Sequence, residues 1–295
     1  MKFYIVTPAY NALHWLRSCV RSVFDQVCEG VEVHHHVQDG GSCDDTAVWL
    51  QAWQNSHADV SGYRLTFESA KDNGMYDALN KAWEKMPADA AVTAHLNCDE
   101  QYLPTALSQV AAAMCKNPEA DIAITSYIII DAQSRYICHR RPVFPHRWIG
   151  HTVCEIITCS CFHRVTTFKK NGVTFDPQWR SIGDLIFYRD ILQHAPRCVV
   201  LPRVFTGVFR VTGNNLAWTD VTAQEWLRYE KTVPASLLKL KKLAAFISNV
   251  KRRTADWWYP APDSYCFYEP DSETRCSRFI KRPTSHWGCR TEGEN

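Results

Sequence analysis

The chain has 295 residues, of which 46% are hydrophobic and 22% are charged, as in an ordinary globular protein. Lys and Arg number 33 and Asp and Glu number 31, which leaves a net charge of +2. Because a polybasic nucleic-acid binder needs many cations to neutralise phosphates, this balance argues against such a binder, and we expect no nucleic-acid partner. The sequence has no run of eighteen apolar residues, so we expect no membrane-spanning helix.

The N-terminus and the cysteines predict a cytoplasmic protein. Residues 1–6 are apolar for too short a stretch to form a signal peptide, and we interpret them as a first buried strand. The 13 cysteines are odd in number and irregularly spaced, which favours reduced thiols. Histidines and cysteines cluster at 34–36 and 159–163 without zinc-finger spacing, so we interpret them as strand residues.

The first half alternates short apolar strands with helical patterns. In chain order we expect strands at 3–7, 31–37, 63–67, 91–96 and 120–130, and helices at 11–27, 48–53, 75–86 and from Pro104. This alternation predicts an α/β fold with a Rossmann-like, mostly parallel sheet flanked by helices on both faces. Ligands of such sheets bind at the carboxyl ends of the strands, so loops 7–11, 39–42 and 99–100 should meet at one edge.

The second half is less regular, and its end can be interpreted in two ways. We expect a strand at 156–165, a helix at 181–193, strands within 198–211 and helical structure at 221–253, followed by an aromatic tail. The basic amphipathic stretch 237–253, together with Trp257 and Trp258, could lie on an anionic membrane surface. The alternative, which we prefer, is a helix packed on the protein through its leucines.

Acidic residues follow two of the expected strands, and another acid opens an expected helix. Asp39 precedes Gly40 and Gly41 and either forms a common turn or bonds a base or ribose. Asp99 and Glu100 follow a buried strand, so they either bind Mg²⁺ or Mn²⁺ or open a helix. Asp184 is either a helix cap or a catalytic group. Glycine-rich dinucleotide and P-loop signatures are absent from the sequence.

Together, six segments resemble the family 2 glycosyltransferases, which have the GT-A fold. The segments are Val6–Asn11, Leu16–Gln26, Gln38–Thr46, Glu68–Lys81, Leu96–Glu100 and Trp179–Asp184. Of these, the segment 38–46 is similar to the family's DGGSTDGT segment, 68–81 is the most specific, and 96–100 resembles the family's variant metal motif. The resemblance covers about residues 3–190. It implies a catalytic domain at 1–215, with a nucleotide-sugar half up to about residue 100, and a helical and aromatic extension at 216–295.

The resemblance also implies roles for individual residues. Asp184 would be the general base of an inverting transfer from a nucleoside-diphosphate sugar, most naturally a UDP-sugar, to a hydroxyl of a glycan or a lipid-linked acceptor. Asp99 would hold Mg²⁺ or Mn²⁺, and Glu100 and His151 are further candidate ligands. The residues implied in nucleotide binding are Thr7, Pro8, Tyr10, Asp39, Gly40 and Asp72.

Departures from the family pattern keep other functions open. Asn97 stands where the family's metal motif often has an acid, and Cys98 replaces a frequent serine. A sugar-nucleotide or glycan-binding protein without turnover is therefore an alternative, although Asp99, Glu100 and Asp184 count against it. A nucleotidyltransferase would need a glycine- and cation-rich loop after the first strand, which residues 10–13 do not supply.

Overall fold

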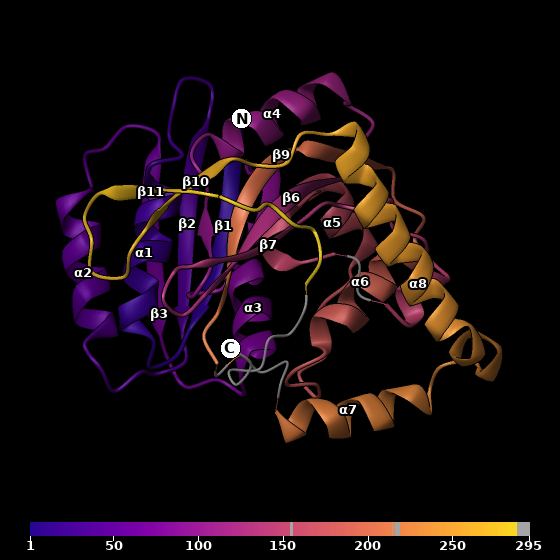
Figure 1. Cartoon of the computed structure of the whole chain (residues 1–295). Coiled ribbons are helices and arrows are strands. Elements are labelled where there is room, and N and C mark those ends of the chain that lie inside the picture. The colour runs from indigo at the N-terminus through magenta and orange to yellow at the C-terminus, as the bar shows by residue number, and fades with distance from the viewer. Residues whose placement is uncertain (154–155, 214, 216–218, 288–295) are drawn as a thin grey trace.

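The computed structural model describes residues 1–153, 156–213, 215 and 219–287. A central sheet is covered by helices on both faces, and the C-terminal segment returns across the molecule toward the N-terminal half (Figure 1). Residues 216–218, where we expected the C-terminal extension to begin, lie outside the described residues. Within the described part of the chain, no helix is long and apolar enough to cross a membrane.

The main sheet contains nine strands among the described residues. The order across it is β3 (Tyr63–Ser69), β2 (Glu32–Asp39), β1 (Lys2–Ala9), β4 (Val92–His95), β8 (Cys161–Arg164), β6 (Ile122–Asp131), β9 (Cys198–Val211) and β5 (Gln101–Tyr102), with β7 (Tyr136–Arg140) beside β6. Strands β3, β2, β1 and β4 are all parallel, as predicted. Strand β8 is antiparallel to both its neighbours, whereas β9 is parallel to β6.

Alternating residues of the strands build a hydrophobic core on each face of the sheet. Phe3 and Ile5 of β1 pack on one side, and Tyr4 and Val6 pack on the other. The first side is covered by α1 (Leu13–Phe24), α2 (Thr46–Ser56) and α4 (Ala106–Lys116). The second is covered by α3 (Met75–Glu84), α5 (Val165–Asn171) and α6 (Gly183–Gln193). The α/β fold with helices on both faces is therefore confirmed.

The second half differs from the prediction in three places. The strand expected at 156–165 is shortened to β8, because the turn η2 (Thr158–Ser160) precedes it and α5 follows it directly. The helical stretch expected at 221–253 divides into α7 (Asp220–Glu230) and α8 (Ala235–Trp258), since Pro234 precedes the second helix. A hairpin of β10 (Ser264–Tyr268) and β11 (Arg275–Phe279) was not predicted.

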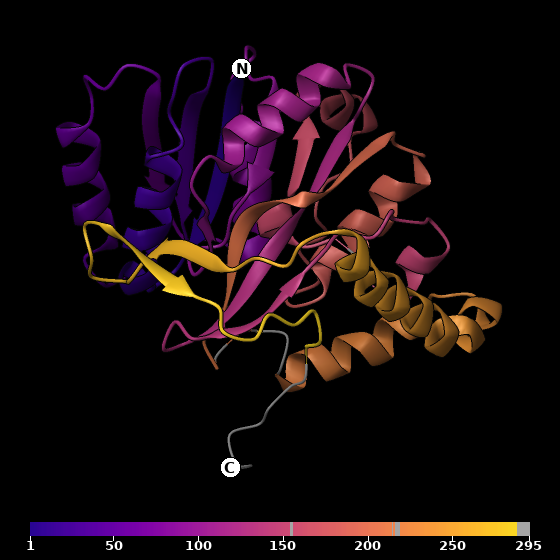
Figure 2. The same cartoon turned by 45° about the horizontal axis from the view of Figure 1, so that its top comes forward.

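The hairpin β10–β11 fastens the C-terminal segment to the N-terminal half (Figure 2). Gln101 exchanges two hydrogen bonds of 2.8 Å with the backbone of Tyr268. Arg275 donates bonds of 2.6 and 2.7 Å to the two carboxylate oxygens of Asp25, the residue that follows α1. Phe267 is fully buried in a cluster with residues of β6 and β9. The segment after α8 is thus packed against the same sheet that carries the candidate site.

Candidate functional site at the carboxyl edge of the sheet

The loops that follow β1 and β2 form one unit, as their parallel pairing requires. The backbone N–H of Asn11 donates to Ser42 Oγ at 2.7 Å, and the N–H of Cys43 donates to Asn11 Oδ1 at 2.9 Å. Asn11 adopts a positive φ of 47°, which asparagine tolerates better than most residues. The predicted meeting of these two loops at one sheet edge is confirmed.

Asp39 is buried beneath this loop unit. Its side chain has 0% exposure, and its carboxylate accepts bonds from the Ser42 N–H at 3.0 Å, the Ser42 hydroxyl and the Ser69 hydroxyl at 2.5 Å. The carboxylate therefore joins the end of β2 to the loop that follows it and to the end of β3. The implied contact with a nucleotide base stays a prediction, and it requires the Ser42 loop to uncover Asp39.

Gly40 and Asp72 lie against each other. A Cβ atom at Gly40 would be 2.9 Å from Asp72 Oδ2, so glycine allows the carboxylate to approach the strand end. Asp72 Oδ1 accepts a bond of 2.8 Å from the N–H of Gly74, which begins α3 with a φ of 109°. The two residues were predicted separately as nucleotide-binding, and the structure places them together.

The other three predicted nucleotide-binding residues differ in exposure. Thr7 has 0% exposure, and its hydroxyl bonds His35 Nε2 at 2.9 Å inside the sheet. Pro8 is also buried, whereas Tyr10 is 64% exposed at the end of β1. Only the Tyr10 ring is therefore at the surface, and Thr7 and Pro8 support the loop from beneath. Their implied contact with a nucleotide stays a prediction.

Glu100 is the last residue of the acidic turn that follows β4, which comprises residues 97–100. Its carboxylate accepts bonds from Thr158 Oγ1 at 2.6 and 2.9 Å and from the N–H of Asn97 at 2.9 Å. Burial, and then the charge of Asp99, raises the pKa of Glu100 to about 8. With only 1% exposure, this side chain organises the turn from inside.

Asp99 remains at the edge of the turn and is only partly buried. Asn215 Nδ2 donates to its carboxylate at 3.3 Å. Burial raises the pKa of Asp99 to about 6, and the nearby Arg210 opposes that rise. The side-chain oxygen of Asn97 is buried without a hydrogen-bond donor in the described structure. The Asp99 carboxylate and the Asn97 side-chain oxygen thus have few hydrogen-bond donors around them, and oxygens of this kind are the ligands that a hard divalent cation prefers.

Asp184 lies in the first turn of α6 and is partly buried. The N–H of Leu185 donates to its Oδ1 at 2.8 Å, and burial raises the pKa of Asp184 to about 6. The charge of Asp184 makes a minor contribution to raising the pKa of Glu100. The implied meeting of the β4 turn and the start of α6 around one ligand stays a prediction.

Two residues that hold the Asp184 segment were missed in the sequence. Tyr76 of α3 donates its hydroxyl to the carbonyl oxygen of Ser181 at 3.0 Å and accepts from the N–H of Asp184 at 3.2 Å. Glu225 of α7 accepts from three successive backbone N–H groups, those of Arg180, Ser181 and Ile182, at 2.6, 2.9 and 3.1 Å. A glutamate 43–45 residues beyond its partners gives no local sequence signal, although Tyr76 lies within the most specific matching segment.

The expected three-residue metal site is not assembled. Across residues 1–153, 156–213, 215 and 219–287, no three His, Cys, Asp or Glu side chains come close enough to hold an ion. His151 lies in the turn η1 (Ile149–His151), where its Nε2 is 3.3 Å from Gln193 of α6, and Glu100 is bound by Thr158. Asp99 is thus the acid that faces outward, because the turn geometry directs its neighbour into the core.

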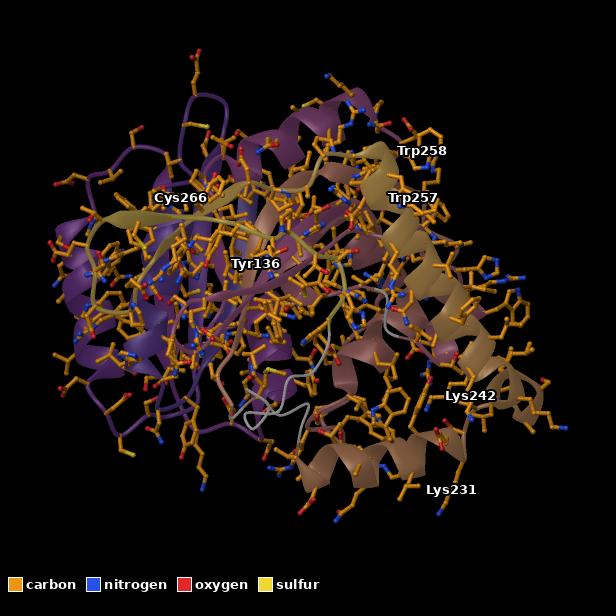
Figure 3. The ribbon with its side chains drawn as sticks, viewed as in Figure 1. Tyr136, Lys231, Lys242, Trp257, Trp258 and Cys266 are labelled. Atoms are coloured by element: carbon orange, nitrogen blue, oxygen red, sulfur yellow. The ribbon has the colours of Figure 1, made fainter. Side chains whose placement is uncertain are left out.

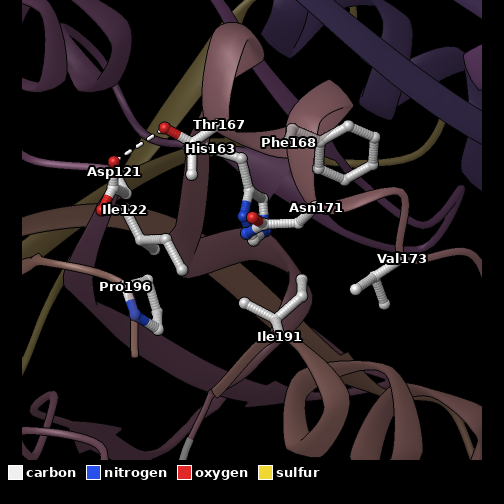
Figure 4. A pocket seen from close by; sticks show the side chains of 9 residues that line it. All are labelled: Asp121, Ile122, His163, Thr167, Phe168, Asn171, Val173, Ile191 and Pro196. Carbon is white, nitrogen blue, oxygen red and sulfur yellow. Dashed lines mark hydrogen bonds between the residues drawn. The ribbon is translucent and has the colours of Figure 1, made fainter. Parts of the chain in front are cut away.

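A separate cavity lies under the sheet, between β6, α5 and α6 (Figure 4). Its wall is largely apolar and includes Ile122, Phe168 and Ile191. Asp121 at its rim accepts a bond of 2.7 Å from Thr167. None of the predicted site residues lines it, so the site at the sheet edge is separate from this cavity.

Comparison with known proteins shows the family and the fold. Residues 4–183 match the family model described as Glycosyl transferase family 2, whereas no curated protein matches the sequence. S. aureus TarS residues 1–349 in complex with UDP-GlcNAc align with a TM-score of 0.60 and 17% identity, over 78% of this chain and 64% of that one. Mannosyltransferase PcManGT from Pyrobaculum calidifontis, in complex with GDP-Man and Mn²⁺, aligns with a TM-score of 0.57 and 15% identity, over 87% and 75%.

These structural likenesses establish the GT-A fold that the sequence predicted. The chain spans 60–64% of the TarS structures that it resembles.

Proposed function

Because the chain belongs to glycosyl transferase family 2 and is a glycosyltransferase, we propose that it is an inverting, metal-dependent enzyme that uses a nucleoside-diphosphate sugar. The donor that we propose is a UDP-sugar, and the acceptor is a hydroxyl of a glycan or of a lipid-linked glycan. TarS and PcManGT, in complex with UDP-GlcNAc and GDP-Man, support a nucleotide-sugar donor. The proposed location is the cytoplasm, with the product used in polysaccharide, glycolipid or cell-surface glycan synthesis.

The observation that carries the proposal is the match of residues 4–183 to the Glycosyl transferase family 2 model, which includes the Asp99 turn and ends at Gly183, directly before Asp184. In the proposed step the acceptor oxygen attacks the anomeric carbon, and its proton passes to the Asp184 carboxylate. The bond from the anomeric carbon to the diphosphate oxygen breaks, and the diphosphate leaves with the electron pair. One displacement inverts the anomeric configuration. The pKa of Asp184, raised to about 6, suits a general base that is ionised at neutral pH.

The metal would be held by Asp99, with the unpaired side-chain oxygen of Asn97 as a second ligand. A bound Mg²⁺ or Mn²⁺ stabilises the negative charge that develops on a leaving diphosphate. Mg²⁺ commonly uses one or two protein oxygens and takes its other ligands from phosphate and water, so a sparse protein site is sufficient. Glu100 supports Asp99 from within the turn, through its bond to the N–H of Asn97.

The test compares Asp184→Asn with Asp190→Asn, a matched change on the same helix. Asp190 is 41% exposed and pairs with Arg189 at the surface. Transfer by Asp184→Asn should fall by about 10²–10⁴-fold, because the acceptor loses its base. Donor binding, measured by thermal shift with UDP-sugars and Mn²⁺, should be retained. A UDP-sugar present at about a hundred times its Kd should stabilise the folded protein by about 2.7 kcal/mol. Wild-type transfer by Asp184→Asn, or retention of configuration in the product, would refute the assigned mechanism.

A further inference from the structure

Helix α8 turns its polar side toward the protein. Ser248 and Arg252 are buried, and Asp256 follows them on the same face at four-residue spacing. Arg252 Nη1 donates to the carbonyl oxygen of Arg141 at 3.0 Å. Asp256 accepts from Arg141 Nε at 2.7 Å and from His139 Nε2 at 2.9 Å. The second half of the helix is therefore fastened to β7 and the segment after it by hydrogen bonds and ion pairs.

The opposite side of α8 is apolar and faces away from the protein. At 100° per residue, its exposed large side chains fall within about 120° of the helix circumference. These are Leu240 (51% exposed), Leu243 (52%), Phe246 (65%), Ile247 (37%), Val250 (41%), Trp257 (81%) and Trp258 (77%), which we call the α8 stripe. Packing through the leucines, the interpretation that we preferred from the sequence, holds only for Leu237 and Leu238 at the start of the helix.

Lysines and arginines accompany the α8 stripe. Lys239, Lys242, Lys251 and Arg253 are exposed, and the last three lie along its two borders. Figure 3 shows Lys242 toward one end of α8 and Trp257 and Trp258 at the other. The single acid of the helix is Asp256, which is bound by Arg141 and His139 on the inner face. The outer face of α8 is thus apolar and positively charged, without an acid of its own.

We propose that α8 lies flat on the surface of an anionic lipid bilayer, with the α8 stripe among the lipid headgroups. Cations bordering an apolar stripe match anionic lipid, and tryptophan is favoured at the membrane interface. A second copy of this chain fits less well, because pairing two such faces would oppose like charges. The 24-residue helix is too polar to cross the membrane. This inference does not depend on the transfer reaction, and it places the enzyme at a cytoplasmic leaflet rich in anionic lipid.

The test is co-sedimentation of the full chain with vesicles. Vesicles of phosphatidylcholine with one third phosphatidylglycerol should bind the chain at least about tenfold more strongly than phosphatidylcholine alone, and added salt should weaken binding. The double variant Phe246→Ser/Trp258→Ser should bind about tenfold or more weakly. Phe279→Ser is the matched control, because Phe279 is 74% exposed on β11.

Charge reversal provides a second, independent pair of variants. Lys242→Glu/Lys251→Glu should weaken binding to the anionic vesicles by about tenfold or more, whereas Lys169→Glu/Lys170→Glu on α5 should not. All four variants change exposed side chains, so their melting temperatures should match the wild type. The proposal is overturned if the wild type does not bind anionic vesicles, or if the stripe variants bind as it does. Dimerisation that Phe246→Ser/Trp258→Ser abolishes, without lipid binding, would instead assign the stripe to a second copy.

Discussion

Replacing Glu225 with Gln should loosen the backbone that leads into α6 and Asp184. The Glu225 carboxylate accepts hydrogen bonds from three backbone N–H groups, and the residue is only 8% exposed. The amide of Gln keeps one acceptor oxygen and turns an NH₂ donor toward N–H groups, so about two of the three bonds should be lost. Hydrogen bonds to a charged group contribute about 1.5–3 kcal/mol each, so losing two predicts a decrease of about 3–6 kcal/mol in the free energy of unfolding.

This decrease in the free energy of unfolding corresponds to a decrease in the melting temperature of Glu225→Gln. With about 2.1 cal/mol/K of unfolding entropy per residue, 295 residues give about 0.6 kcal/mol/K, so the melting temperature should fall by roughly 5–10 °C. Glu230→Gln on the same helix is the control, because Glu230 forms a surface ion pair with Lys241 at 2.7 Å. Such pairs contribute at most about 1 kcal/mol, so this variant should shift by less than 2 °C.

Scanning fluorimetry and steady-state kinetics measure the two effects. In Glu225→Gln, kcat should fall while the Kd of the donor is retained, because the Asp184 segment shifts and the nucleotide loops do not. If Glu225→Gln and Glu230→Gln had the same melting temperature and the same kcat, the positioning role of Glu225 would be wrong.

Further predictions concern glycines and buried histidines. Gly183→Ala would place a Cβ 2.5 Å from the buried ring of Tyr76, so we expect a loss of about 1–3 kcal/mol in urea unfolding together with a lower kcat; wild-type values for both would contradict this packing. Gly40→Ala should displace Asp72 and raise the donor Kd by roughly tenfold in calorimetric titration, with an unchanged Kd counting against a nucleotide site there. Burial lowers the pKa of five histidines to about 3–4, below the unfolded value of 6.5, so their stabilising effect is complete above pH 6.5 and is lost as the pH falls toward 4. At pH 5.5 each histidine should lower the free energy of unfolding by about 1 kcal/mol, only partly offset by the raised pKa values of the site carboxyls. The urea midpoint should therefore fall between pH 7 and 5.5, and an unchanged or higher midpoint would contradict the prediction. The histidines are His34, His35, His36, His95 and His163.

The parallel half of the sheet could be predicted because its signals are local. Alternating apolar residues in β1 and β2 and helical spacing in α1 and α3 specify the elements, and parallel pairing then brings their loops to one edge. Topology therefore placed the loops at 7–11, 39–42 and 99–100 at one edge, whereas the place of Asp184 in the site was implied only by the family resemblance. The hairpin β10–β11 was missed because its stability comes from distant partners such as Asp25 and Gln101.

The sequence by itself determined the family, the α/β architecture and the acids that we propose for catalysis, since these follow from motifs and periodicity within short segments. Which side chains face outward was decided only by the tertiary structure. Thr158 directs Glu100 into the core, Glu225 holds the backbone before Asp184, and Arg141 binds the polar face of α8. Helical periodicity defines two faces but not which one is buried, and contacts between residues far apart in the chain make that choice.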